Sequence, residues 1–202
     1  MTAPRLSGRL AASALLVAGL IGLAGCAADP LAEQYLAGDN KGFIAADGLQ
    51  TVEIAVGERT DPIVFSGTSD TGTTLTSEDF AGQVLVVNFW YAACGPCIVE
   101  APELEAAYQA VAGEEVSFLG INTSDSAATA RSFAADNGVS YPSLIAAGDA
   151  ELKLAFTAAT PLNATPVTLV IDREGRVAAR IIGSLADSSI LTTLVRDTLA
   201  ES

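Results

Sequence analysis

The chain has 202 residues, half of them hydrophobic, which is enough for one domain with a buried core. Its formal net charge of −14 repels phosphate backbones and argues against nucleic acid as a partner. The absence of histidine excludes imidazole general bases and every metal site that needs an imidazole ligand.

The N-terminal segment has the pattern of an export signal. Arg5 and Arg9 make its start positive, and residues 10–23 form an apolar stretch shorter than the ~20 residues of a membrane-spanning helix. The tetrapeptide that follows, Leu23-Ala24-Gly25-Cys26, resembles the lipobox of bacterial lipoproteins, in which the cysteine is acylated and becomes the new N-terminus. We therefore expect lipidation at Cys26 and anchoring on the extracytoplasmic face of the bacterial cell membrane. An ordinary secretory signal with an incidental cysteine is the alternative.

Three parts are predicted along the chain: a lipoprotein signal peptide over residues 1–25, a flexible tether over 26–49, and a folded domain over 50–202. The tether is rich in Ala, Gly and Asp and shows no sustained hydrophobic period. The domain is expected to open with a β-hairpin, in which residues 52–56 and 63–65 are the two strands.

A buried strand followed by a helix forms the centre of the predicted domain. Residues 84–89 are an almost unbroken apolar run, which is typical of a strand buried on both faces. Beyond Cys94 the apolar residues recur at spacings of four, three, four and three, which predicts a helix. The other expected elements are a strand at 116–121, a helix at 127–136, an edge segment at 141–145, part of a helix at 151–156, a hairpin of strands 167–171 and 177–182, and a last helix at 188–199. This order predicts an α/β domain, a mixed sheet with helices on both faces.

The motif Cys94-Gly95-Pro96-Cys97 lies where the buried strand meets this helix. Unpaired amide donors and about half a positive charge at a helix N-terminus stabilise a thiolate. Cys94 should therefore be the more acidic and more exposed thiol, with Cys97 as the shielded resolving thiol. Pro96 suits the first helical turn, where its missing donor costs nothing.

The residues around this motif resemble the active-site segment of thioredoxin-like proteins, and two matches point to TlpA/ResA-like thiol reductases. Cys97 is followed by Ile98-Val99-Glu100-Ala101-Pro102, which is similar to that family's glutamate and proline. Thr165-Pro166, ahead of the apolar run 167–171, is similar to its cis-proline loop. The resemblance implies a thioredoxin-like fold and a Cys94–Cys97 redox disulfide. We expect the β-hairpin of residues 52–65 to be an N-terminal extension of this fold, and we expect no metal or other cofactor.

Two positions depart from the thioredoxin pattern. Asn88 stands where thioredoxins have a buried aspartate, and Ala93 stands where they usually have tryptophan. The first change is compatible with the TlpA/ResA pattern, in which the helix glutamate supplies the carboxylate. Glu100 is then a candidate catalytic group, because its position three residues after Cys97 puts it on a neighbouring surface of the helix. An ordinary solvated helix residue is the alternative.

The resemblance implies an enzyme that exchanges disulfides with protein substrates. It implies a reductase, for example one that keeps the haem-binding cysteines of apocytochrome c reduced, with a membrane thiol protein of the CcdA or DsbD type as electron donor. A disulfide-forming oxidase or isomerase uses the same fold, and a passive binding lipoprotein is the non-enzymatic alternative. Two alternatives remain for the cysteine pair. One is half of a zinc site, but the sequence has no second cysteine pair to complete it. The other is a purely structural disulfide, but a disulfide that closes so short a loop stabilises a fold little.

Overall fold

The computed structural model describes residues 43–44, 50–161 and 165–201. All of them belong to one compact unit, Asn40–Ser202. Cys26, the predicted signal peptide and most of the predicted tether lie outside the described residues, so these assignments stay predictions. Two residues of the predicted tether, Phe43–Ile44, form strand β1. Within the described ranges, no helix has the length and apolar character needed to span a bilayer.

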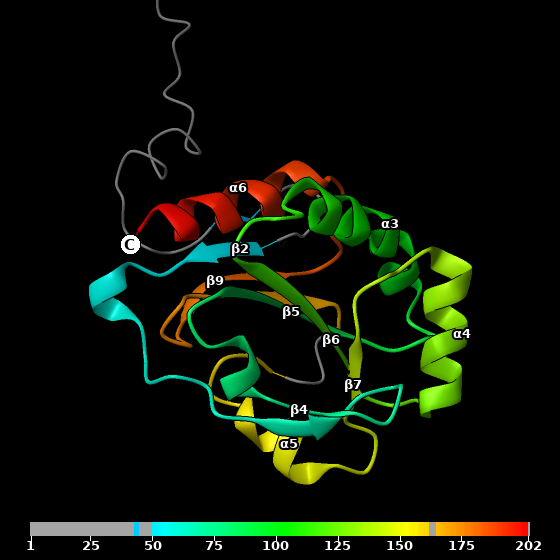
Figure 1. Ribbon diagram of the computed structural model, residues 1–202. Coiled ribbons are helices and arrows are strands. Elements are labelled where there is room, and N and C mark those ends of the chain that lie inside the picture. The colour runs from blue at the N-terminus through cyan, green and yellow to red at the C-terminus, as the bar shows by residue number, and fades with distance from the viewer. Residues whose placement is uncertain (1–42, 45–49, 162–164, 202) are drawn as a thin grey trace, which may run out of the picture. The chain divides into compact units, whose positions relative to one another are not determined.

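A mixed sheet organises the domain (Figure 1). Its strands are β1 Phe43–Ile44, β2 Gln50–Glu53, β5 Val84–Trp90, β6 Val116–Asn122, β7 Ser143–Ile145, β8 Val167–Ile171 and β9 Val177–Ile182. Their order across the sheet is β1-β2-β9-β8-β5-β6-β7. Strands β5, β6 and β7 run parallel to one another, and every other neighbouring pair is antiparallel.

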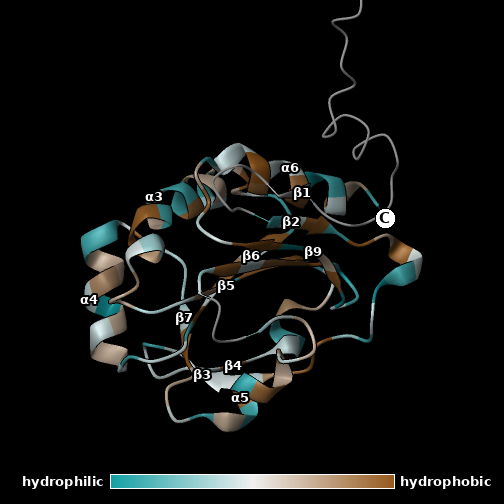
Figure 2. Ribbon diagram, turned by 180° about the vertical axis from the view of Figure 1, so that it is seen from behind, coloured by the Kyte–Doolittle hydropathy of each residue, from teal (hydrophilic) through white to brown (hydrophobic). Residues whose placement is uncertain are grey.

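Helices cover both faces of this sheet, which confirms the predicted fold class. Helices α3 (Gly95–Ala110) and α6 (Ser188–Ala200) pack on one face, and α4 (Ala127–Asn137) lies beside α3. Helix α5 (Ala150–Ala155) and a small hairpin of β3 (Ser66–Thr68) and β4 (Thr74–Thr76) cover the other face. Figure 2 shows the central strands as the most hydrophobic part of the ribbon.

The apolar run of β5 is explained by its central place, because every residue of the strand is buried. Val84 and Val86 face the core under α3 and α6, whereas Leu85, Val87 and Phe89 face the core on the side of α5. A strand with two buried faces gains from apolar side chains at every position, and the usual alternation disappears. The strand ends at Trp90, and the chain then turns into α3.

The hairpin predicted from residues 52–56 and 63–65 is wrong. Strand β2 pairs with β9 and β1, so the N-terminal extension lengthens the main sheet. Residues 63–65 form no strand, although Phe65 is buried against Phe80 and Phe156 while Val64 is 78% exposed. This in-and-out alternation is the pattern of a strand, but an extended segment that buries alternate side chains under the sheet has the same period. Ile63 bonds instead through its amide to the carbonyl of Gly175.

Candidate active site

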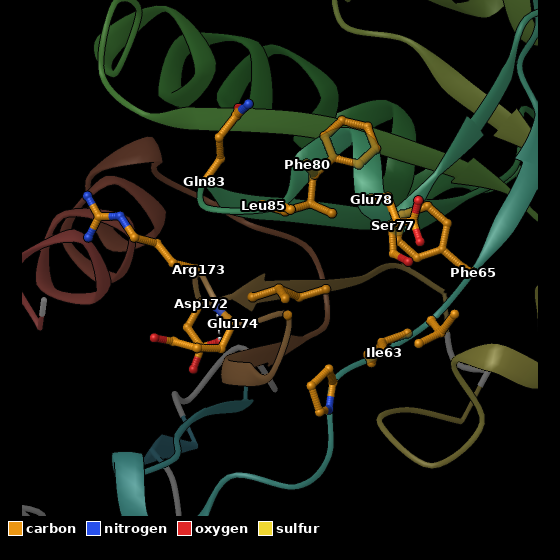
Figure 3. Close-up of a pocket in the computed structure, with 15 residues that line it drawn as sticks. Ile63, Phe65, Ser77, Glu78, Phe80, Gln83, Leu85, Asp172, Arg173 and Glu174 are labelled. Carbon is orange, nitrogen blue, oxygen red and sulfur yellow. Dashed lines mark hydrogen bonds between the residues drawn. The ribbon is translucent and has the colours of Figure 1, made fainter.

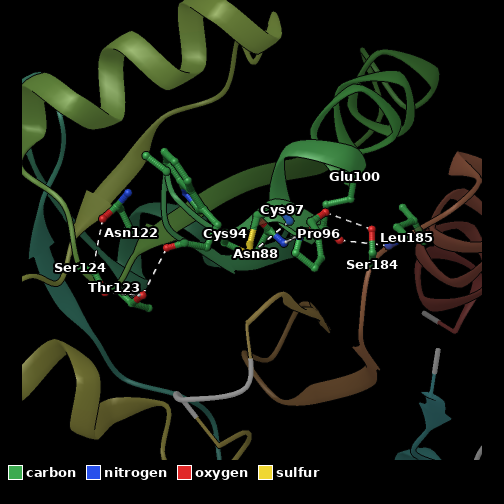
Figure 4. The surroundings of a disulfide bond; sticks show 12 residues. Asn88, Cys94, Pro96, Cys97, Glu100, Asn122, Thr123, Ser124, Ser184 and Leu185 are labelled. Atoms are coloured by element: carbon green, nitrogen blue, oxygen red, sulfur yellow. Dashed lines mark hydrogen bonds between the residues drawn. A yellow bond between two sulfur atoms is a disulfide. The ribbon is translucent and has the colours of Figure 1, made fainter. Parts of the chain in front are cut away.

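Cys94 and Cys97 are joined by a disulfide at the N-terminus of α3 (Figure 4). Cys94 is the N-cap of the helix, and its Sγ accepts a hydrogen bond of 3.2 Å from the Cys97 amide. Pro96 lies in the first turn, as the sequence predicts. A sulfur in this place faces the positive end of the helix dipole, so the fold favours a thiolate at Cys94 when the disulfide is reduced.

The predicted difference in exposure between the two cysteines is not found in this oxidised state. Cys94 is 3% exposed and Cys97 is 2% exposed. The disulfide turns the Cys94 sulfur toward its partner, and both belong to an apolar cluster with Trp90 and Phe133. The neighbouring residues Ala93, Gly95 and Pro96 are all exposed, so the disulfide lies just below the surface.

Glu100 is buried, with only 1% of its surface exposed. Its two carboxylate oxygens accept hydrogen bonds from the Asn88 side-chain amide at 2.8 Å and from the Leu185 backbone amide at 3.0 Å. Burial raises the pKa of the Glu100 carboxyl from 4.5 to about 7, although both hydrogen bonds act to lower it. The alternative of an ordinary solvated helix residue is wrong, and this carboxyl can gain or lose a proton near neutral pH.

Asn88 binds this carboxyl and lines the same small cavity as the inner cysteine. Its amide donates to Glu100 and, at 3.1 Å, to the Thr168 hydroxyl. It also lines, together with Cys97 and Tyr141, a cavity of about 10 Å³ behind the disulfide, which is close to the smallest space that holds one water. Burial and the carboxylates of Glu100 and Glu105 raise the pKa of Tyr141, so this phenol stays neutral. The buried acid of this site is thus Glu100 on α3, and Asn88 on β5 supplies a hydrogen-bond donor that holds its carboxylate in place.

The loop between β9 and α6 touches three parts of the site, and the sequence reading missed it. The Gly183 amide donates to the carbonyl of Pro166 at 3.1 Å, and the Thr165–Pro166 peptide bond is cis, as the resemblance implies. The Ser184 hydroxyl donates to the Pro96 carbonyl at 3.1 Å, and the next residue binds Glu100 (Figure 4). One loop therefore joins the cis-proline, the first turn of α3 and the buried carboxylate.

A second missed contact ties the turn before Cys94 to the end of β6. The Asp125 carboxylate accepts hydrogen bonds from the Ala92 amide at 2.6 Å and from the Asn122 side chain at 2.9 Å. The Thr123 amide donates to the Trp90 carbonyl at 3.0 Å. Parallel strands bring their carboxyl ends to one edge of a sheet. The polar residues directly after the predicted strand 116–121 could therefore have been expected to lie near the cysteine motif.

A larger cavity, of about 170 Å³, lies elsewhere in the domain (Figure 3). It is lined mainly by apolar side chains, among them Ile63, Phe65 and Phe80, and Glu78 and Arg173 also belong to its lining. Leu85, near the start of β5, belongs to its lining, whereas Cys94 follows the end of that strand. The cavity is therefore separate from the disulfide.

Known proteins resemble this chain in sequence and in fold. Residues 44–194 match the family described as Redoxin. The thiol:disulfide interchange protein HelX of Rhodobacter capsulatus is 33% identical over 109 residues, which cover 54% of this chain and 57% of HelX. The thiol-disulfide oxidoreductase ResA of Geobacillus thermodenitrificans is 28% identical over 68% of this chain and 75% of its own length.

Among solved structures, the fold resembles a secreted thiol-disulfide isomerase from Corynebacterium glutamicum. The TM-score is 0.69 with 26% sequence identity, and the match covers 79% of this chain and 98% of that one. A DsbF homologue from Corynebacterium diphtheriae gives a TM-score of 0.64 with 25% identity, over 77% of this chain and 98% of the other.

Proposed function

Because the chain belongs to the Redoxin family, we propose that it is a thiol–disulfide oxidoreductase that works through Cys94 and Cys97. The observation that carries this proposal is the disulfide at the start of α3, with a buried carboxyl three residues beyond it. The names of HelX and ResA describe the same chemistry in relatives.

In the reducing direction, the Cys94 thiolate attacks one sulfur of a substrate disulfide, and the first substrate thiolate leaves. Cys97 then gives its proton to a base and attacks the Cys94 sulfur, which releases the second substrate thiolate and forms the Cys94–Cys97 disulfide. Two electrons pass to the substrate, whose thiolates take protons. Glu100 suits the role of the base, because its carboxyl has a pKa of about 7 and is linked to the Cys97 cavity through Asn88.

We place the physiological reaction in the reducing direction, on protein disulfides such as those of apocytochrome c, with electrons from a membrane thiol protein of the CcdA or DsbD type. The resemblance of the active-site segment to TlpA/ResA-like thiol reductases and the dipeptide Gly95-Pro96 support this direction. An oxidase or isomerase is the second candidate, favoured by the likeness to the secreted isomerase of C. glutamicum.

The direction is tested by the reduction potential of the Cys94–Cys97 couple, measured by equilibration with glutathione and dithiothreitol buffers. We expect a value nearer that of thioredoxin, about −270 mV, than that of DsbA, about −120 mV. The reduced protein should also reduce the disulfide of a synthetic Cys-x-x-Cys-His peptide, the haem-attachment pattern. A potential near −120 mV would contradict the reducing direction and favour the oxidase. If the protein exchanged electrons with no disulfide, the passive binding protein would be the remaining interpretation.

We further propose that the mature protein is held on the extracytoplasmic face of the membrane by acyl chains on Cys26. The tetrapeptide Leu23-Ala24-Gly25-Cys26 after an apolar stretch supports this proposal. Replacing Cys26 with serine should release the protein from the membrane fraction and abolish labelling by a fatty-acid probe. The Cys94→Ser variant is the matched control, and it should keep both. Unchanged retention and labelling in Cys26→Ser would contradict the proposal.

A further inference from the structure

The outer face of α3 differs from the exposed faces of the other helices in the described part of the chain. All its exposed residues are uncharged: Gly95, Pro96, Ile98, Val99, Pro102, Ala106, Gln109 and Ala110. Exposed residues of α4 and α6 include Arg131, Asp136, Arg196 and Asp197, and those of α5 include Glu151. An uncharged helix face is unexpected in a chain with a net charge of −14.

The three glutamates of α3 all turn away from this face. Glu100 is buried, Glu103 accepts a hydrogen bond from the Ser188 amide, and Glu105 accepts hydrogen bonds from the amide and hydroxyl of Ser140. The helix therefore has acidic residues, but tertiary contacts hold each of them on its inner side or flanks.

Two large apolar side chains of this face, Ile98 and Val99, follow the disulfide directly. Val99 is 69% exposed and Ile98 is 44% exposed, and they are two of only five large hydrophobic residues that are exposed in the described ranges. Gly95, Ile98, Pro102 and Ala106 recur at spacings of three and four, so they share one side of the helix. We call Gly95, Ile98, Val99, Pro102 and Ala106 the α3 stripe.

We propose that the α3 stripe is a docking surface for an uncharged, apolar stretch of an extended polypeptide next to its reacting cysteine. This inference rests on the proposed function, because the substrate position comes from the mixed disulfide. A substrate bonded to Cys94 begins at the end of the stripe that carries Gly95, and its flanking residues can lie along the helix. From Gly95 to Ala106 the stripe is roughly 16 Å long, a span that about five extended residues cover.

The apolar, uncharged side chains of the α3 stripe favour an apolar segment of the substrate over a charged one. Apolar side chains that cover Ile98 and Val99 are stabilised in proportion to the area they remove from water. A charged side chain gains nothing from these uncharged residues, and an acidic one is also repelled by the net charge of −14. The other exposed hydrophobic residues, Val56, Val64 and Leu154, adjoin no reacting group.

The test uses the reduced full-length protein and two synthetic peptide disulfides of equal net charge. One has leucine and isoleucine within five positions of its cysteine, and the other has serine and glycine there. The readout is the ratio of their second-order rate constants. We expect the wild-type ratio to be about 10 in favour of the apolar peptide, and to fall toward 1 in Val99→Gln and in Ile98→Gln/Val99→Gln. Leu154→Gln is the matched control, since Leu154 is also 69% exposed on a helix, and it should keep the wild-type ratio.

The possible results separate the inference from the proposed function. If the wild type reacts with both peptides at the same rate, or if the ratio survives in both stripe variants, the docking surface is refuted and the activity stands. If the wild type reacts with neither peptide, the proposed function fails and the inference fails with it. A ratio of 1 together with a concentration-dependent dimer that the stripe variants abolish would assign the face to a second copy of this chain, and would overturn the proposal.

Discussion

Replacing Cys97 with serine should stop turnover and leave the protein covalently bonded to its substrate through Cys94. The Cys94 sulfur lies at the helix N-terminus and accepts the Cys97 amide, so it is the sulfur that the fold stabilises as a thiolate. Without Cys97 the mixed disulfide can be resolved only by thiols from solution. A resolving group held in place has a very large effective concentration, so turnover should fall by roughly 10³-fold or more. Non-reducing gel electrophoresis with mass spectrometry detects the trapped complex.

The matched control is Cys94→Ser, which removes the other sulfur of the same disulfide. It should accumulate no mixed disulfide, because the remaining thiol faces the cavity lined by Asn88 and Tyr141 behind the site. Trapping through Cys97 in this control, or rapid turnover by Cys97→Ser, would contradict the assignment of Cys94 as the nucleophile.

Replacing Glu100 with glutamine should slow the resolution of the mixed disulfide and remove a titration near pH 7 from its rate. The substitution removes the carboxylate that we propose as acceptor of the Cys97 proton, while the shape of the side chain is kept. General bases contribute typically 10²- to 10⁴-fold, so we expect a decrease of about 10²-fold in the resolution rate above pH 7. We also expect the pKa of at least one cysteine to fall, since a buried negative charge disfavours a thiolate. Single-turnover kinetics and thiol alkylation between pH 5 and 9 measure both effects.

The same substitution should change how stability depends on pH. The pKa of Glu100 rises from 4.5 to about 7 on folding, so the folded state holds the proton more tightly than the unfolded state does. The stabilisation from this group is fully present below about pH 4.5 and is lost as the pH rises through about 7. The full loss corresponds to about 3 kcal/mol at most. Urea unfolding of the wild type should show this decline between pH 5 and 8, and Glu100→Gln should lack it.

Glu103→Gln is the matched control for Glu100. It lies on the same helix, and its carboxylate also accepts a backbone amide, that of Ser188, but it is only half-buried. This variant should keep the wild-type resolution rate and pH profile. If Glu100→Gln and Glu103→Gln give the same profiles as the wild type, Glu100 has no part in the proton transfer and its burial serves only packing.

Much of the fold could be predicted from the sequence because its signals are local. The continuous apolar run predicts a buried strand at residues 84–89, and β5 extends one residue further, to Trp90. The periodic pattern beyond Cys94 predicts a helix, and α3 begins directly after Cys94. Gly138 ends α4 in a left-handed conformation, and Asp187 caps α6 through its side chain. The hairpin from residues 52–56 and 63–65 was predicted wrongly, since local alternation does not say which strand is the partner.

The sequence by itself determined which residues are candidates for the chemistry: two cysteines with Gly-Pro between them at a helix start, a glutamate one turn further and, through the family resemblance, a cis-proline segment far along the chain. Only the tertiary structure decided how deep that glutamate lies and what holds it. The pKa of Glu100 depends on burial under the sheet and on the Leu185 amide, 85 residues away. Asp125 reaches the turn before Cys94 only because β5 and β6 run parallel. Burial and long-range hydrogen bonds depend on how distant segments pack against one another, so they cannot be inferred from the spacing of residues in the sequence.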